Sequence, residues 1–142
     1  MTKNLSFITS LVLLLPIIFL SGCKTTTRSK IPVQFQVNDE TLSTEVLALV
    51  KCQNIKVSGS ETKVNGKHTG SEVLIEIMNP VNLPADQTSQ DDLTIKIARV
   101  LKPALKQSNL FDTFKVLFVF QSTSGGTTST RYTGHIWKSN EI

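Results

Sequence analysis

The spacing of apolar residues predicts an alternation of helices and strands over residues 33–142. Apolar residues recur at helical spacing across residues 40–53, and Asn38 before them suits a helix N-terminus. Residues 54–64 and 71–79 instead alternate between apolar and polar, and the Asn-Gly pair between them is typical of a tight turn. The pattern therefore predicts one helix followed by an antiparallel hairpin.

The rest of the chain predicts a second helix and a second hairpin. Ser89 is a candidate helix cap, and the segment after it begins with the alternation of a strand. The segment also has a longer apolar stripe at helical spacing, acidic residues at its start and basic residues at its end, which together favour a helix. Pro103 should kink or split that helix, because proline cannot donate a backbone hydrogen bond. Residues 111–121 form a strongly apolar stretch that predicts a central strand, and residues 128–138 predict the final strand.

These elements predict an α+β fold in two layers, with two helices packed on a mostly antiparallel four-stranded sheet in the order α-β-β-α-β-β. The sequence VQFQV at residues 33–37 offers a short extra strand at the N-terminal end. Residues 54–64 are expected at the outside of the sheet, with a bulge at Gly59. Residues 23–32, rich in Thr, Ser and Lys, are expected to form a flexible tether to a single domain at residues 33–142.

A different pattern occupies the N-terminus. Residues 5–20 are mostly apolar, the only charge before them is Lys3, and no acidic residue precedes Asp39. A basic start followed by an apolar run is typical of a secretory signal peptide. A retained transmembrane helix is the alternative, but it needs about 20 apolar residues. This run is shorter and contains Pro16, so the signal peptide is the better interpretation.

The apolar run ends in Leu20-Ser21-Gly22-Cys23, which resembles the lipobox of bacterial membrane lipoproteins. That resemblance implies a signal peptide at residues 1–22 that is removed before Cys23. It also implies a diacylglyceryl group on the Cys23 sulfur and a fatty acid such as palmitate on the new amine. Lipoproteins retained at the inner membrane commonly have aspartate at the next position, so Lys24 implies the outer membrane. No acidic cluster follows Lys24, which favours the periplasmic face.

A lipidated Cys23 changes how the other cysteine and the charge are interpreted. Cys52 would have no disulfide partner and is expected to be a small, partly buried thiol. The signal peptide contains one of the fifteen basic residues and none of the eleven acidic ones, so the mature net charge is near +3. An exported protein rarely meets nucleic acid, so no such partner is expected. Lys24, Arg28 and Lys30 either contact anionic headgroups or belong to a solvated linker.

No arrangement for catalysis, metal binding or cofactor binding is recognisable in the sequence. The two histidines, His68 and His135, lack a nucleophile motif and a ligand partner at short spacing. Glu72 and Glu76 share one face of a strand but stand roughly 13 Å apart, too far for the usual acid and base pair. We therefore expect a protein that is not an enzyme and that uses no metal or cofactor.

Two groups of residues form a candidate interaction surface. The first is the basic side of the second helix, which either meets anionic lipid or glycan or simply faces solvent: Lys96, Arg99, Lys102 and Lys106. The second brings polar-tipped aromatic residues to the last strand, where they either receive a partner or pack in the core: Tyr132, His135 and Trp137.

The chain is also similar to small envelope lipoproteins of certain Gram-negative bacteria, through Asn82-Leu83-Pro84, the helix after it and the strand FDTFKVLFV. That similarity implies no catalytic residue. The sequence therefore predicts a lipid-anchored, non-catalytic lipoprotein of the cell envelope that binds or scaffolds another envelope component. Two alternatives remain. One is a small envelope hydrolase that uses His68 or His135, and the other is an inhibitor or immunity factor against a secreted toxin.

Overall fold

The computed structural model describes residues 24–142, which form a five-stranded sheet and two helices. The strands are β1 (Thr26–Ile31), β2 (Asn54–Val64), β3 (Lys67–Met78), β4 (Thr113–Ser124) and β5 (Thr127–Lys138). The helices are α2 (Asp39–Leu49) and α3 (Gln87–Ala104), and two 3-10 turns lie at Ser108–Leu110 and Ser139–Glu141. The predicted signal peptide and Cys23 lie outside the described residues.

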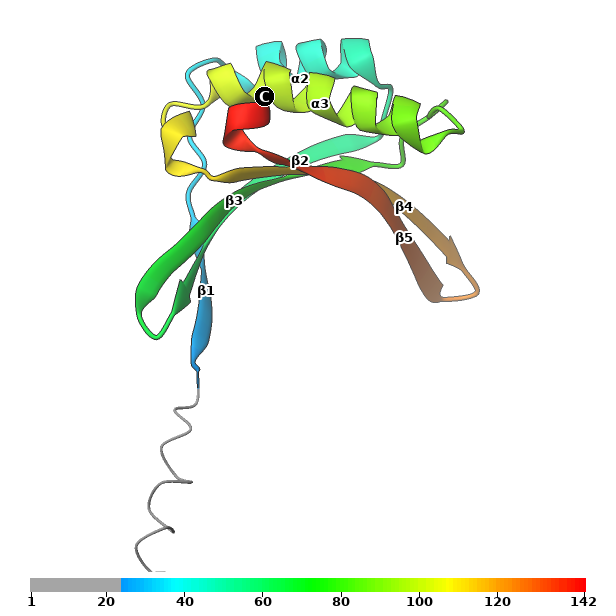
Figure 1. Ribbon diagram of the computed structural model, residues 1–142. Coiled ribbons are helices and arrows are strands. Elements are labelled where there is room, and N and C mark those ends of the chain that lie inside the picture. Colours follow the sequence, from blue (N-terminus) through cyan, green and yellow to red (C-terminus); the bar gives the residue numbers. More distant parts are fainter. Residues whose placement is uncertain (1–23) are drawn as a thin grey trace, which may run out of the picture.

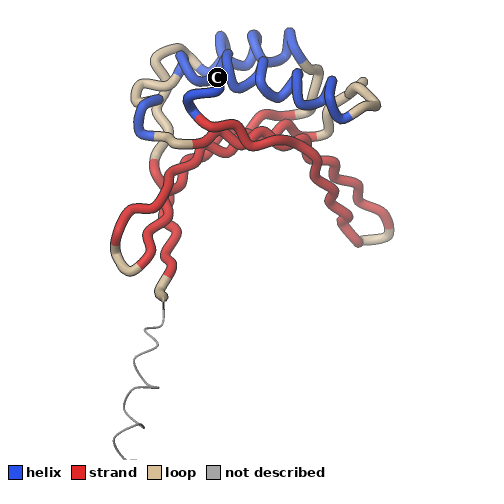
Figure 2. The backbone as a smooth tube through the Cα atoms, in the orientation of Figure 1, coloured by secondary structure: helices blue, strands red, loops and turns tan. Residues whose placement is uncertain are grey.

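The strands lie in the order β1-β2-β3-β4-β5, and both helices cover the same face of the sheet (Figures 1 and 2). β3 and β4 are parallel and are joined through α3, whereas the other neighbouring pairs within residues 24–142 are antiparallel. The predicted α+β class and its two helices are confirmed. The sheet is mixed and five-stranded rather than four-stranded. α3 carries the chain back so that β4 runs in the direction of β3, and β1 adds the fifth strand.

Residues 26–31 of the predicted flexible tether at residues 23–32 instead form β1. Its residues TTRSKI pair with β2 along the whole strand, from Thr26 opposite Val64 to Ile31 opposite Gly59. All of them except Ile31 are exposed, so backbone hydrogen bonds rather than apolar burial hold the strand at the sheet edge. Because β1 has no apolar alternation, the hydrophobic pattern does not reveal it.

The position of β2 also differs from the prediction. β2 lies between β1 and β3 rather than at the outside, and its register shifts at Thr62 and Lys63 rather than at Gly59. Gly59 instead permits close packing, since a Cβ atom there would lie 2.8 Å from the carbonyl oxygen of Ile31. Position 59 is therefore occupied by glycine because β1 lies too close for a side chain.

The segment between β1 and α2 does not form the predicted short strand. Of residues 33–37, only Phe35 forms a strand-like bridge, and its partner is Leu105. The Gln36 backbone N–H donates to the carbonyl of Ala104 at 2.7 Å. VQFQV therefore runs beside the end of α3 and connects the sheet edge to the helical layer.

The two helices begin at capping side chains. Asn38 caps α2 as predicted, because its Oδ1 accepts a 2.8 Å hydrogen bond from the Thr41 backbone N–H. α3 begins earlier than predicted, because Asp86 is its cap and accepts a 2.8 Å bond from the backbone N–H of Ser89. Pro103 lies in the last turn of α3 and does not split the helix.

The hydrophobic core lies between the sheet and the helices. Alternate residues of β3 and β4 face it, as the sequence predicts, and buried residues of α2 and α3 meet them. Fully buried members of this core are Val73, Ile75, Ile77, Phe114, Val116, Phe118, Val46, Ile97 and Leu101. Burying side chains of this size contributes about 1.5–3 kcal/mol each, so this contact is the main source of stability.

The sheet is longer than the helical layer and curves away from it. β3 and β4 pair only over residues 72–78 and 113–119, so the two hairpins extend beyond the overlap at opposite ends. This offset gives the sheet a length of about 55 Å, whereas the 18 residues of α3 span only about 27 Å. Figure 1 shows both hairpins bending away from the helices, so that the helix-free face is concave.

The curved sheet forms an arch, and each hairpin end that extends beyond the overlap of β3 and β4 is called an arm. The first arm comprises β1 and residues 59–71, and the second arm comprises residues 120–131. Asn65 and Gly66 at the first tip both have positive φ, at 51° and 77°, which confirms the predicted Asn-Gly turn. The concave face carries the other alternate side chains of the strands, among them Lys56, Glu72, Leu74, Glu76, Lys115, Leu117, Tyr132 and Ile136.

Gly134 provides a test of this sheet geometry. A Cβ atom at Gly134 would lie 2.0 Å from the carbonyl oxygen of Val116 in the neighbouring strand, a separation that forces the backbone to shift. We expect Gly134→Ala to lower the free energy of unfolding by about 1–3 kcal/mol. Gly70→Ala is the matched control, because its nearest neighbour atom would be 4.0 Å away. Urea denaturation measures both variants, and equal losses would contradict the close approach of β5 to β4.

Candidate functional site

Two of the aromatic residues proposed for an interaction surface instead attach β5 to α3. Trp137 is half-buried and its Nε1–H donates a 3.0 Å hydrogen bond to Oγ1 of the fully buried Thr94. The His135 ring stacks on Trp137, with ring centroids 4.1 Å apart. His135 Nδ1 also lies 3.2 Å from Asp91 Oδ1 on α3. These contacts position the helix on the sheet, so the two side chains already have structural partners.

Tyr132 lies on the opposite face of the sheet from His135 and Trp137. It is 58% exposed and belongs to the concave face. Residues at odd and even positions of a strand point to opposite faces. The predicted aromatic group is therefore not one surface, because the sheet separates Tyr132 from the other two residues.

The four basic residues predicted for one side of the second helix do not all remain exposed. Lys96 and Arg99 are exposed, as expected for the outer face of an amphipathic helix. Lys106 is also exposed, but it lies two residues past the end of α3 rather than on the predicted helix. Lys102 is half-buried, and its Nζ donates to the carbonyl of Ser139 at 2.5 Å and to that of Ile142 at 3.4 Å. Lys102 thus holds the C-terminal end of the chain, and three of the four predicted cations remain accessible.

His68 lies near two carboxylates on the first arm. Its Nδ1 is 3.7 Å from Glu61 Oε2, and its Nε2 is 3.6 Å from Asp112 Oδ2. Hydrogen bonds from the Ser71 hydroxyl and backbone N–H, followed by the nearby His68, hold the pKa of Asp112 below its usual value. Together these groups form a polar cluster between the first arm and the start of β4.

Ser71 is the hydroxyl closest to this cluster, but it is not presented to solvent. It is 4% exposed, and its Oγ lies 2.6 Å from the Leu110 carbonyl oxygen and 2.9 Å from Asp112 Oδ2. The backbone N–H of Asp112 donates back to Ser71 Oγ at 3.1 Å. Ser71 therefore joins β3 to the residues before β4, and its buried hydroxyl is not presented as a nucleophile to solvent.

The remaining reactive groups have ordinary surroundings. Cys52 is half-buried against the core, and burial raises the pKa of its thiol, with a smaller opposing effect from a backbone hydrogen bond to Asn54. A raised pKa leaves the thiol protonated and unreactive. Within residues 24–142, no group of three or more His, Cys, Asp and Glu side chains is placed to hold a metal ion.

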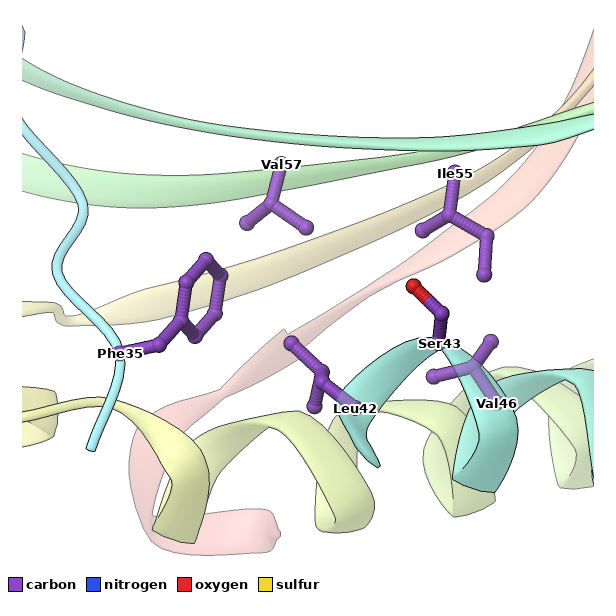
Figure 3. Close-up of a pocket in the computed structure, with 6 residues that line it drawn as sticks. All are labelled: Phe35, Leu42, Ser43, Val46, Ile55 and Val57. Atoms are coloured by element: carbon purple, nitrogen blue, oxygen red, sulfur yellow. The ribbon is translucent and has the colours of Figure 1, made fainter. Parts of the chain in front are cut away.

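A cavity that the sequence does not reveal lies between α2 and β2. It has a volume of about 240 Å³, and Figure 3 shows its side chains converging from α2, β2 and the segment before α2. The residues that line it have apolar side chains apart from one hydroxyl group: Phe35, Leu42, Ser43, Val46, Ile55 and Val57. The only hint in the sequence is Ser43 beside the apolar stripe of the helix. The cavity carries no charged group that would orient a polar ligand.

The concave face combines exposed apolar side chains with charges. Ile136 is 51% exposed there, close in the register to Leu74 and Lys115. Arg28 crosses two strands on the same face, with its Nη2 2.6 Å from Glu72 Oε1 and its Nε 3.1 Å from Ser60 Oγ. Arg28 is therefore part of the sheet surface rather than a tether residue.

Comparison with known proteins gives no assignment: no family model, curated protein or solved structure matches the chain. Neither helix of residues 24–142 combines the length and the hydrophobicity that a membrane span requires.

The contact between Trp137 and Thr94 can be tested by mutation. Thr94→Val keeps the side-chain shape but leaves the Trp137 N–H without its acceptor, so we expect the free energy of unfolding to fall by about 1–3 kcal/mol. Thr88→Val on the exposed start of α3 is the control and should change it by less than about 0.5 kcal/mol. Urea denaturation followed by the fluorescence of Trp137, the single tryptophan, measures both. A neutral Thr94→Val would show that this bond does not hold β5 to α3.

Proposed function

We propose that this chain is a lipid-anchored, non-catalytic lipoprotein of the cell envelope that binds or scaffolds another envelope component. The observation that carries the anchor is the motif Leu20-Ser21-Gly22-Cys23 behind an apolar run. The first strand begins only three residues after Cys23, at Thr26. A folded domain directly behind the cleavage position fits a mature chain that starts at Cys23.

The lipid supplies the attachment in this proposal. One acyl chain binds a membrane only marginally, whereas two or three make release slow, because each buried methylene contributes about 0.8 kcal/mol. Lys24 in the position after the lipidated cysteine supports the outer membrane, and the lack of an acidic cluster after Lys24 supports its periplasmic face. The proposed location therefore depends on Cys23 and its neighbour, and not on the folded domain.

Binding rather than catalysis is supported by how the polar residues are used. His135 and Trp137 attach β5 to α3, and Ser71 joins two strands. The concave face, in contrast, exposes Ile136 and Tyr132, and Ile136 lies opposite Lys115. Aromatic and apolar residues at the centre with charges around them are characteristic of protein interfaces, so we assign the concave face as the binding surface.

Replacement of the proposed lipidated residue tests the anchor. Cys23→Ser should abolish incorporation of labelled palmitate, leave the signal peptide uncleaved, and prevent release of the mature chain into the outer-membrane fraction. Cys52→Ser is the control, because Cys52 lies in the folded domain, and should behave like the natural chain. Unchanged processing and fractionation of Cys23→Ser would rule out a lipoprotein.

Crosslinking in the cell tests the binding surface. A photoreactive amino acid at Ile136, on the concave face, should give a discrete crosslinked product, whereas the same group at Arg99, on the outer side of α3, should not. Adding Lys115→Glu should lower the yield at Ile136, since it reverses a charge on the same face. Equal yields from both positions, or no effect of the charge reversal, would contradict a partner on the concave face.

A further inference from the structure

The start of the described chain is fixed to the tip of the first arm. The backbone N–H of Thr25 donates to Asn65 Oδ1 at 3.0 Å, and the backbone N–H of Asn65 donates to the Thr25 carbonyl at 2.8 Å. Thr26 then pairs with Val64 as the first residue of β1. Thr25 is therefore part of the arm and not of a linker that lets the domain move away from its N-terminus.

The distance from this tip to Cys23 is short. Cys23 precedes Thr25 by two residues, and two residues of extended chain span at most about 7 Å. This distance is smaller than the roughly 8–10 Å over which surface charges act at physiological salt. A lipid on Cys23 would therefore bring the tip of the first arm to the headgroup region.

The charges at this tip fit an anionic surface. Lys24 and Lys67 are exposed, and neither forms an ion pair with any residue from 24 to 142. Lys63 is different, because its Nζ lies 2.8 Å from Glu61 Oε1. The carboxylate of Glu72 is likewise engaged, by Arg28. Two lysines thus remain uncompensated at the place where the chain leaves the domain.

We propose that the tip of the first arm lies against the bilayer and that Lys24 and Lys67 bind anionic lipid headgroups. This inference rests on the lipidation of Cys23 in the proposed function. It adds an orientation: the first arm points toward the bilayer, and the helical layer lies on the far side of the sheet. Figure 1 shows β1 and both arms on the side opposite the helices. Lys96 and Arg99 on α3 then face away from the membrane.

Acetylation of lysines, measured by mass spectrometry, tests the orientation. The lipidated full-length product is purified from membranes and placed in vesicles of phosphatidylethanolamine and phosphatidylglycerol. Relative to the same protein in detergent, Lys24 and Lys67 should react several-fold more slowly on vesicles, while Lys96 should react at an unchanged rate. Equal protection of all three lysines, or protection of Lys96 alone, would overturn the proposal.

A spacer variant supplies the control for the short connection. Inserting about twelve Gly and Ser residues between Lys24 and Thr25 adds roughly 20 Å of flexible reach, so the protection of Lys67 should be lost while the protein stays on the vesicles. Persistent protection of Lys67 would show that the tip binds without its short connection, and would overturn that part of the proposal. Failure of the lipidation itself gives a different result, because the purified chain then lacks the mass of the lipid on Cys23.

Discussion

The parallel pairing of β3 with β4 over seven residue pairs is the constraint on which the rest of the structure depends. Parallel strands need a crossover, and α3 provides it on the face where Ile75 and Val116 are buried. The pairing is offset along the strands, so one hairpin overhangs at each end of the sheet. The same contact thus determines the core, the position of α3 and the arched shape of the helix-free face.

The parts of the fold that depend on apolar burial could be predicted from the sequence. Val73, Ile75 and Ile77 alternate along β3 and are fully buried, and the Asn-Gly turn is where the pattern places it. β1 could not be predicted in the same way, because its residues TTRSKI are held by backbone hydrogen bonds and bury almost nothing. A strand stabilised only at the edge of a sheet has no hydrophobic period to detect.

The candidate surface residues were harder to place, for reasons that differ from residue to residue. Tyr132 is separated from His135 and Trp137 by strand alternation, which the sequence does contain. The contact of Lys102 with the C-terminal carbonyls depends on tertiary packing, which no local pattern shows. The fixing of Thr25 to Asn65 likewise joins residues forty positions apart. The sequence therefore supplied the candidate residues, but the topology determines which residues lie next to each of them.

The second arm differs from the rest of the sheet because neither of its faces is buried. Residues 121–131 are exposed on both faces, and their cross-strand partners are mostly Ser and Thr, such as Thr123 opposite Thr128. Where neither face is buried, strand register is weakly specified. The turn at Gly125 and Gly126 and the contact of Arg131 with the Phe120 ring then set the alignment. Lengthening or shortening this ribbon at its turn would therefore leave the core covered.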